Sequence, residues 1–392
     1  MDNISYLVGK EEIMTSRERF LKIARFQLPN AIYLSPYTQG VWHKTLERWV
    51  AEGAPQEILT DNVARYRYFE LDRIGMVRVE ASLIALGPKG GAPFIPPVRP
   101  RFESRVLEED ERSRVRINEA GVTIREFKDD PERMPLWLDY PVKNRKDWDE
   151  YKKRLDPHHP ERWLVKDWDS YADRLSKRDY PLGLDVGSFF GLLREVVGAE
   201  KLLLLFYDDP QFVEDMMVHM EYFSIQIVER VLKDIQVDFA FFWEDMAWKG
   251  GSMISPEMFR EFMMPHYKRV TSLLRSQGVD IIMVDSDGDI NELIPLWIES
   301  GVNGMWPLEV QAGVDAVEIR KKFGKECILW GNIDKKALAQ GKEAIKEEID
   351  KKVPFLISEG GYFPGPDHFI PEDVSLENFQ FYLEYLRSLD QS

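Results

Sequence analysis

The stretch that most constrains the fold of this chain is residues 279–308, VDIIMVDSDGDINELIPLWIESGVNGMWPL. It begins with a β-branched run of the kind that forms a strand buried on both faces, and this run ends in the acidic sequence DSDGD at 285–289. Apolar residues at helical spacing come next and predict a helix that is bent at Pro295 and ends at Gly301, directly before another apolar run. The stretch is therefore predicted to form a βαβ unit whose acids lie at the carboxyl end of its first strand.

Asp285 and Asp287 are the most informative of these acids. Alternate residues of a strand point to the same side, so both carboxylates are expected to face one region of the molecule. An Asp in a strand-to-helix loop also commonly caps the helix or stabilises a turn, so a structural role stays open for each of them taken singly.

The alternation of strand and helix continues through the second half of the chain and predicts a closed (β/α)8 barrel. After Pro181, six or more strand–helix units follow one another, which favours a barrel over an open sheet. Near the amino end, a capping box at residues 15–18 predicts the first helix, and residues 31–34 are expected to be the first strand. We expect residues 1–392 to form a single barrel domain.

Residues 66–163 show a different pattern, which predicts an insertion. Segments within this range alternate apolar and charged residues at period 2, and a turn is expected at 118–121. Proline-rich segments flank them. We therefore expect an antiparallel β-meander that is folded over one end of the barrel and serves as a lid or as a docking surface for a partner.

The composition excludes several classes of protein and partner. A net charge of −16 argues against binding to nucleic acid or to an anionic membrane, since both attract basic surfaces. The one cysteine, Cys327, excludes a disulfide framework and a metal site of several thiolates. No uninterrupted apolar span is long enough to cross a bilayer, and we expect a soluble cytoplasmic protein.

Polar residues close each predicted strand, and a barrel would place them around one mouth. They are Asp185, Glu244, Asp245, Asp285, Asp287, Glu309, Asn332, Asp367 and His368. Two carboxylates and a histidine are a suitable ligand set for zinc, and carboxylate-rich surroundings also suit manganese or magnesium. An acid/base site without a metal is the alternative.

Several common reaction classes lack their sequence signatures. The chain has no P-loop, no dinucleotide-binding glycine fingerprint and no serine nucleophile elbow in a suitable context. Phosphoryl transfer from a nucleotide, hydride transfer and serine hydrolysis are therefore disfavoured.

Five segments carry a family resemblance in combination. They are TSRERFLKIARF, ISPEMFREFMMPHYK, GVNGMWPLEVQAGVDAVEIRKKFG, LWGNID with a later QGK, and GGYFPGPDHFIPEDVSLENF. From residue 15 to its end, the chain resembles the uroporphyrinogen decarboxylase superfamily, which contains the decarboxylases of haem synthesis and the corrinoid-dependent methyltransferases. This resemblance implies a (β/α)8 barrel.

One departure from the family pattern concerns the substrate. The haem-pathway decarboxylases hold the carboxylates of their substrate with an arginine-rich segment near the amino end, whereas the corresponding stretch here, YLSPYTQGVW, contains no arginine. A tetrapyrrole with many carboxylates would meet a cluster of acids without that counter-charge. Porphyrinogen decarboxylation is therefore disfavoured.

A second departure concerns the metal. The thiol-methylating branch binds zinc through a His-x-Cys motif and a Cys near the end of the chain, and the matching positions here are Asp285, Asp287 and His368. The resemblance thus implies that zinc would be held here by two carboxylates and an imidazole, which are harder ligands than thiolates. Such a site suits a Lewis acid that polarises an oxygen or nitrogen. It implies a methyltransferase that moves a methyl group from an O- or N-methylated small molecule, such as an aryl methyl ether, to the cobalt of a corrinoid.

The corrinoid is expected on a separate partner protein, because none of the six histidines lies in an Asp-x-His-x-x-Gly signature. The candidate catalytic residues are Glu244, Asp245, Asp185, Glu309 and Asn332, with Glu244 the expected supplementary metal ligand or proton donor. The candidates for lining a pocket for an aromatic ring are Tyr37, Trp243, Trp248, Trp306 and Tyr362, although barrel packing explains them equally well. A decarboxylase acting on a smaller carboxylated substrate, or a binding barrel without chemistry, are the alternatives.

Overall fold

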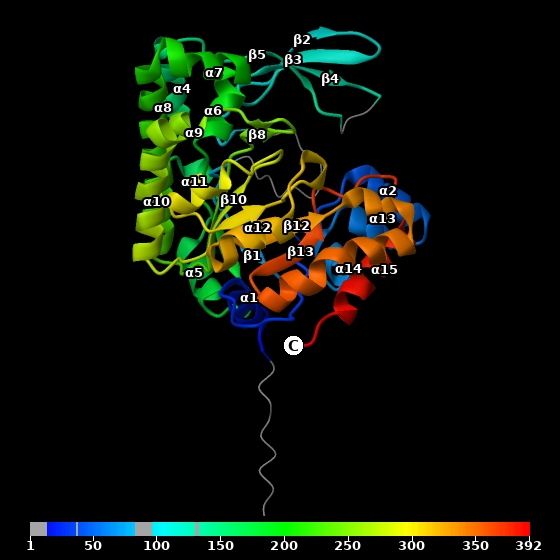
Figure 1. Cartoon of the computed structure of the whole chain (residues 1–392). Coiled ribbons are helices and arrows are strands. Elements are labelled where there is room, and N and C mark those ends of the chain that lie inside the picture. Colours follow the sequence, from blue (N-terminus) through cyan, green and yellow to red (C-terminus); the bar gives the residue numbers. More distant parts are fainter. Residues whose placement is uncertain (1–13, 37, 83–95, 130–132) are drawn as a thin grey trace, which may run out of the picture.

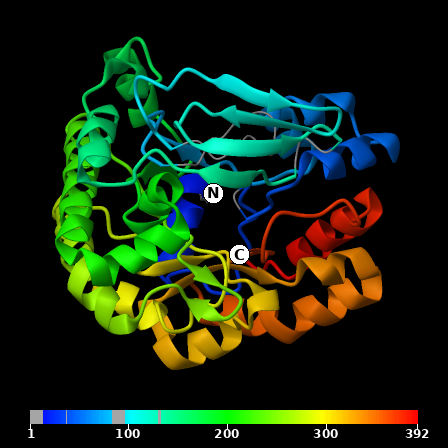
Figure 2. The ribbon, with the colours of Figure 1, turned by 90° about the horizontal axis from the view of Figure 1, so that it is seen from above.

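The central element is a curled sheet of parallel strands with helices around its outside (Figure 1, Figure 2). The computed structural model describes residues 14–36, 38–82, 96–129 and 133–392, and in these ranges the sheet has seven strands in the order β1-β6-β7-β10-β11-β12-β13. The strands are β1 (Gly75–Met76), β6 (Leu182–Asp185), β7 (Phe239–Trp243), β10 (Ile282–Asp285), β11 (Gly304–Trp306), β12 (Ile328–Ile333) and β13 (Tyr362–Pro366). The predicted α/β barrel class is confirmed.

The outer helices begin and end largely where local sequence signals place them. They are α1 (Ser16–Ala24), α2 (His43–Ala51), α3 (Asn62–Tyr68), α4 (Arg145–Tyr151), α5 (Trp168–Ser176), α6 (Phe190–Val197), α7 (Ala199–Asp208), α8 (Pro210–Leu232), α9 (Pro256–Met258), α10 (Met264–Ser276), α11 (Ile294–Glu299), α12 (Ala316–Phe323), α13 (Lys335–Gln340), α14 (Lys342–Glu359) and α15 (Leu376–Ser388). The capping box before α1 is present, since Thr15 accepts from the backbone N–H of Glu18 and Glu18 accepts from that of Thr15.

One helix differs from its prediction. Helix α11 begins at Ile294, so Pro295 lies in its first turn and does not bend it. A proline is well placed there, because the first backbone N–H groups of a helix have no intrahelical partner. Residues 291–293 form a turn directly before this helix.

The eighth place in the ring is filled by an extended segment, residues 31–34, which was expected to be a strand. This segment is buried but has no regular strand pairing. The backbone N–H of Leu34 donates to the carboxylate of Asp72 at 2.6 Å, and the Tyr33 ring lies 5.9 Å from that of Phe363 on β13. The segment thus lies between β13 and the chain leading to β1. The carboxylate of Asp72 takes the place of a backbone acceptor for Leu34.

Aromatic rings close the floor of the barrel. Phe20, from α1, has its ring centroid 5.6 Å from that of Tyr33, 5.4 Å from Phe239, 5.9 Å from Trp330 and 5.1 Å from Phe363. These partners come from the segment at 31–34 and from strands β7, β12 and β13. Because this end is packed with rings, a small molecule can enter only at the carboxyl ends of the strands.

The predicted meander is a four-stranded antiparallel sheet, ordered β2 (Arg105–Glu109), β3 (Ser113–Ile117), β4 (Thr123–Phe127) and β5 (Leu136–Asp139). The turn at 118–121 is present, with the side chain of Asn118 accepting from two backbone N–H groups. Gly75–Met76, near the start of the range expected to form the insertion, pair in parallel with β6 and belong to the barrel.

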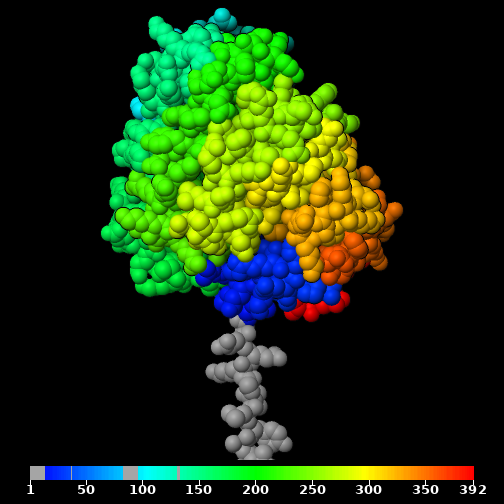
Figure 3. Space-filling model, turned by 60° about the vertical axis from the view of Figure 1, so that its left-hand side comes forward, coloured from blue at the N-terminus to red at the C-terminus, as the bar shows by residue number. Residues whose placement is uncertain are grey.

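The antiparallel sheet lies at the end of the molecule opposite α1, as Figures 1 and 3 show. The short hairpin of β8 (Ala247–Trp248) and β9 (Gly251–Ser252) lies on the same side, between the sheet and the barrel (Figure 1). The sheet therefore stands over the end at which the parallel strands finish. None of the helices in the described ranges combines the length and apolarity needed to span a membrane.

Candidate active site

Ring contacts that pass over intervening strands identify the side chains inside the barrel. The ring of Phe239 on β7 lies 6.1 Å from that of Trp330 on β12, and the ring of Phe241 lies 5.9 Å from that of Trp306 on β11, across β10. Side chains alternate along a strand, so Trp243 faces inward with Phe239 and Phe241. The carboxyl ends of β7 and β11 thus each present a tryptophan to the interior.

Asp285 lies between these two tryptophans. It is the direct neighbour of Trp243 on one side and of Trp306 on the other in the register of the sheet. All residues of β6, β7, β12 and β13 are buried, whereas β10 and β11 each end in a partly exposed residue, Asp285 and Trp306. These two residues therefore form an accessible part of the barrel interior.

The carboxyl group of Asp285 has no hydrogen-bond or ion-pair partner among the described residues. Protein closely surrounds it despite its accessible surface, and this burial raises the pKa of Asp285 well above its usual range. The negative charges of Asp287 and Asp245 raise the pKa further.

Asp245 has a fixed cation. Nη2 of Arg194, on α6, donates to Oδ2 of Asp245 at 2.7 Å, and Nη1 donates to the Asp245 backbone carbonyl at 2.6 Å. Burial raises the pKa of Asp245, and Arg194 opposes this shift. The guanidinium also lies 5.6 Å from the ring of Trp243, which is 7% exposed and serves as a wall of the site.

Asp287 is paired with His368. Nε2 of His368 lies 3.3 Å from Oδ2 of Asp287, and both side chains keep about a third of their surface exposed. Burial lowers the pKa of His368, but the hydrogen bond and charge of Asp287 outweigh it, so the net pKa is raised. The His368 ring stacks on Trp42 at 6.2 Å.

Glu244 lies in the wall and not in the interior. Its carboxylate is fully buried and accepts five hydrogen bonds. Three come from the backbone N–H groups of residues 189–191, at the amino end of α6, and the others from Ser188 and Tyr267. The carboxylate therefore caps α6, and the structure does not bring it together with Asp285 and His368 as a ligand or donor.

Asp185 faces the interior beside Phe241, one layer below Trp243. It accepts from the backbone N–H and hydroxyl of Ser82, at 2.9 and 2.7 Å, and from the N–H of Gly187 at 2.9 Å. Burial raises the pKa of Asp185 to about 6, although these hydrogen bonds favour its charged form. This carboxyl group changes charge in the weakly acidic range.

Two further candidates hold loops at the rim. Asn332 is fully buried and donates to the carbonyls of Leu308 and Val314 at 2.7 and 2.8 Å, so it holds the loop after β11 in place. Glu309 is half-buried and accepts from the backbone N–H of Gly288 at 3.0 Å. Gly288 has φ +83°, and a Cβ there would lie 2.6 Å from the backbone of the β8 strand, so the acidic loop needs glycine to approach this hairpin.

The remaining aromatic candidates do not form one pocket. Tyr362 is at the amino end of β13, 1% exposed, with its hydroxyl donating to the carbonyl of Gly331 at 2.8 Å, so it belongs to the core. Trp248 is 62% exposed on its hairpin. Tyr37 lies outside the described residues.

The predicted zinc ligands do not converge as a metal site. His368 and Asp287 are in direct contact, but within the described parts of the chain no three His, Cys, Asp or Glu side chains lie close enough together to hold a metal ion. Cys327 is buried before the amino end of β12. The arrangement of these donors does not fit zinc.

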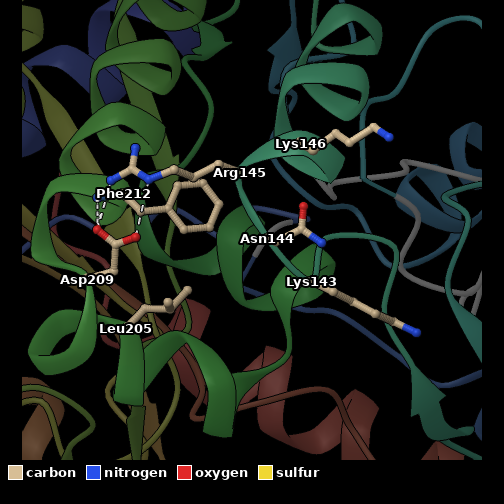
Figure 4. A pocket seen from close by; sticks show the side chains of 7 residues that line it. All are labelled: Lys143, Asn144, Arg145, Lys146, Leu205, Asp209 and Phe212. Atoms are coloured by element: carbon tan, nitrogen blue, oxygen red, sulfur yellow. Dashed lines mark hydrogen bonds and ion pairs between the residues drawn. The ribbon is translucent and has the colours of Figure 1, made fainter.

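A separate hollow of about 390 Å³ lies outside the barrel, where the loop before α4 meets α7 and α8 (Figure 4). Its lining residues are Lys143, Asn144, Arg145, Lys146, Leu205, Asp209 and Phe212. Arg145 points to Asp209 and forms ion pairs with it and with Asp215. Lys143 is also paired, with Asp139, and the hollow lies where the insertion packs on the helices.

Two residues at the site were missed from the sequence. Arg194 is the cation for Asp245, and Lys335 lies 3.3 Å from both carboxylate oxygens of Asp367. Arg194 lies on the helix after β6, a position whose side chain could have been expected near the mouth; Lys335 directly follows the Asp334 cap of α13.

Comparisons with known proteins agree with this barrel. The family model described as "Uroporphyrinogen decarboxylase (URO-D)" matches residues 119–389, well over half of the chain. A uroporphyrinogen decarboxylase from Synechocystis sp. is 26% identical over 148 residues, which are 37% of this chain and 40% of that relative, so the match spans less than half of either protein.

One solved structure shows the same fold. A methyltransferase from Methanosarcina mazei superposes with a TM-score of 0.57 and 14% identity, covering 96% of this chain and 99% of its own. A B12-independent methionine synthase from Shewanella sp. W3-18-1 gives a TM-score of 0.40 and 11% identity over 74% of each chain. On the extent of the family match, the chain belongs to the uroporphyrinogen decarboxylase (URO-D) family.

Proposed function

We propose that this URO-D-type enzyme moves a methyl group from an O- or N-methylated small molecule to the cobalt of a corrinoid carried by a separate partner protein. The observation that carries the proposal is the charge at the barrel mouth. Asp245, Asp285 and Asp287 gather there, and the nearby cations are already paired with carboxylates: Arg194 with Asp245, His368 with Asp287, and Lys335 with Asp367. A substrate with many carboxylates would be repelled, whereas a neutral or cationic methylated compound would not.

His368 supplies a proton in this reaction. The bond between the methyl carbon and its oxygen or nitrogen breaks, and its electron pair stays on the leaving atom, which then needs a proton. His368 has a raised pKa, faces the mouth and is held by Asp287, which stabilises the imidazolium until the proton leaves. The corrinoid, when its carrier is bound, supplies the electron pair that takes the methyl group.

The antiparallel sheet offers a place for the partner. Its edge strand β5 exposes Leu136 and Leu138, and Trp137 of the same strand hydrogen-bonds to Glu195. Glu195 in turn accepts from Arg194 at 3.0 Å, the same guanidinium that holds Asp245. A partner docked on this sheet would therefore lie close to the site.

The structural neighbour from Methanosarcina is described as a methyltransferase, which supports methyl transfer as the reaction. The Synechocystis relative is a decarboxylase and supports a second candidate function, decarboxylation of a small carboxylated substrate. Incubation with a Co(I) corrinoid protein and a panel of methoxylated aromatics and methylamines separates the two. We expect methylcobalt to form, followed by its absorption spectrum. Release of carbon dioxide from a carboxylated substrate, without methylcobalt from any donor, would establish the second candidate instead.

A matched pair of variants tests the docking surface. Replacing Leu136 and Leu138 by Asp should lower the rate of transfer to the corrinoid protein much more than it lowers binding of the small substrate. The control is Leu204→Asp on α7, which is also exposed but lies off the sheet. Equal losses of binding and transfer would make the sheet a structural insertion only.

A further inference from the structure

We propose that the barrel mouth recognises a methylated ammonium group, which lies against Trp306 with Asp285 as its counter-ion. This inference rests on the proposed function and narrows the methyl donor to an N-methylated cation, away from an ether. Its basis is the placement of an acid without a partner beside an accessible indole.

Asp285 and Trp306 lie on the same face of the sheet, and both reach the accessible surface of the mouth. Asp285 and Trp306 are lateral neighbours in the register of β10 and β11, and both are the partly exposed last residues of otherwise buried strands. The ring of Trp306 is fixed from the interior by Phe241. A ligand that enters the mouth therefore meets a carboxyl group and an indole side by side.

The charges of the site are incomplete without a cation. Asp245 is paired with Arg194 and Asp287 with His368, while Asp285 has no cation among the described residues. Of these three carboxyl groups, only that of Asp285 has no cation paired with it in the described ranges. A single positive charge on the ligand would complete the set, since opposite charges at this distance favour the ionised form.

Trp306 selects the kind of cation. Its indole Nε1–H is buried and has no acceptor in the described structure, so the exposed part of this residue is not the polar edge of its ring. Aromatic faces attract organic cations such as quaternary ammonium groups and provide no lone pair to a metal ion. An ammonium carrying methyl groups fits both the ring and the carboxylate.

The donor of a methyl group is then the cation itself. Loss of a methyl from a quaternary ammonium breaks a C–N bond and leaves a neutral amine with the electron pair. That amine takes the proton of His368 and becomes a cation again, so Asp285 stays paired through the reaction. The other site residues keep the roles described above.

Calorimetric titration of the full chain tests this inference. The probes are choline and its neutral isostere dimethylbutanol, in which carbon replaces nitrogen. We expect choline to bind at least about tenfold more tightly, the magnitude of a desolvated cation–π contact together with an ion pair. Equal affinity, tighter binding of the neutral isostere, or binding of zinc with no binding of choline would each overturn the inference.

Variants assign the effect to the two residues. Asp285→Asn should abolish the preference for choline over its isostere, because it removes the charge but keeps the shape. Trp306→Leu should weaken choline binding about tenfold. The matched controls are Trp248→Leu, an exposed tryptophan on the nearby hairpin, and Asp289→Asn, an acid of the same loop that accepts from Asn291; both should leave the preference unchanged.

The two proposals fail differently. If choline binds as expected but no methylamine yields methylcobalt, the recognition site stands and the proposed methyl transfer is wrong. If methoxylated aromatics yield methylcobalt while ammonium compounds neither bind nor react, methyl transfer stands and the ammonium inference is wrong.

Discussion

Glu244 and Asp285 are two acids at neighbouring strand ends, one fully buried and one partly exposed, and they differ in their partners. Glu244 directly follows β7, Asp285 ends β10, and the backbone N–H of Glu244 donates to the carbonyl of Asp285 at 2.9 Å. Glu244 accepts five hydrogen bonds, whereas the carboxyl of Asp285 has none among the described residues.

This difference separates a structural acid from a functional one. A buried carboxylate that is fully hydrogen-bonded repays its desolvation and strengthens the fold, while one without partners costs stability wherever it stays. A protein keeps the second kind where a ligand supplies the missing partner. The contrast predicts opposite results for the same substitution at the two positions.

The largest effect is expected for Glu244→Gln. The new amide would place an N–H donor against backbone N–H groups that need an acceptor, and we expect the free energy of unfolding to fall by about 3 kcal/mol. Urea denaturation measures this. Glu309→Gln, at a half-buried acid with a single backbone donor, is the control and should lose less than about 1 kcal/mol. Similar losses for both would remove the contrast.

Asp285→Asn should give the opposite pattern. Asparagine keeps the shape and removes the repulsion from Asp245 and Asp287, so the free energy of unfolding should stay within about 1 kcal/mol of wild type or rise. Methyl transfer should fall about a hundredfold, equivalent to about 2.7 kcal/mol in the barrier. Loss of stability with unchanged turnover would show that Asp285, like Glu244, has a structural role.

Much of the fold was predictable because its signals are local. Strand–helix alternation after Pro181 and the capping box at Thr15 depend on residues near in sequence, and both are confirmed. Residues 31–34 were wrongly assigned as a strand because the carboxylate of Asp72, far along the chain, takes a backbone donor there. Pro295 was misplaced because the same residue suits a first turn as well as a kink.

The sequence predicted where the site lies but not what each of its acids does. Strand-end acids were expected around one mouth, and Asp287 and His368 do meet there. Sequence could not separate Glu244 from Asp285, because the partners of Glu244 are the amides of residues 189–191 and Tyr267, none of them near it in sequence. Roles of buried acids follow from partners, which only the fold brings together.

Asp185 is intermediate, having hydrogen bonds but no cation, and it should make stability depend on pH. Its raised pKa of about 6 means that the folded state holds a proton which the unfolded state, near its ordinary value, releases. The free energy of unfolding should therefore fall as pH rises from about 4 to about 6, by at most about 1.4 kcal/mol per pH unit. Asp185→Asn should remove this fall; an unchanged slope in denaturation curves would place the proton elsewhere.

The smallest effect is expected for the partly exposed pair of Asp287 and His368. Asp287 differs from Asp285 in having a cation beside it, so this pair shows what a cation alone changes. Burial lowers the pKa of His368, but the hydrogen bond and charge of Asp287 raise it by more, so the folded pKa lies above the ordinary histidine value. The stabilisation from this pair is complete below that ordinary value, about 6.5, and is lost as pH rises through the folded pKa. In NMR titrations, the His368 ring signal should have a lower midpoint in Asp287→Asn than in wild type, whereas His219, which contacts the carbonyl of Leu155 and not Asp287, should keep its midpoint in both. A His368 midpoint that does not move would mean that Asp287 leaves the imidazole proton unsupported, and the proton would then have to come to the leaving group from Asp285.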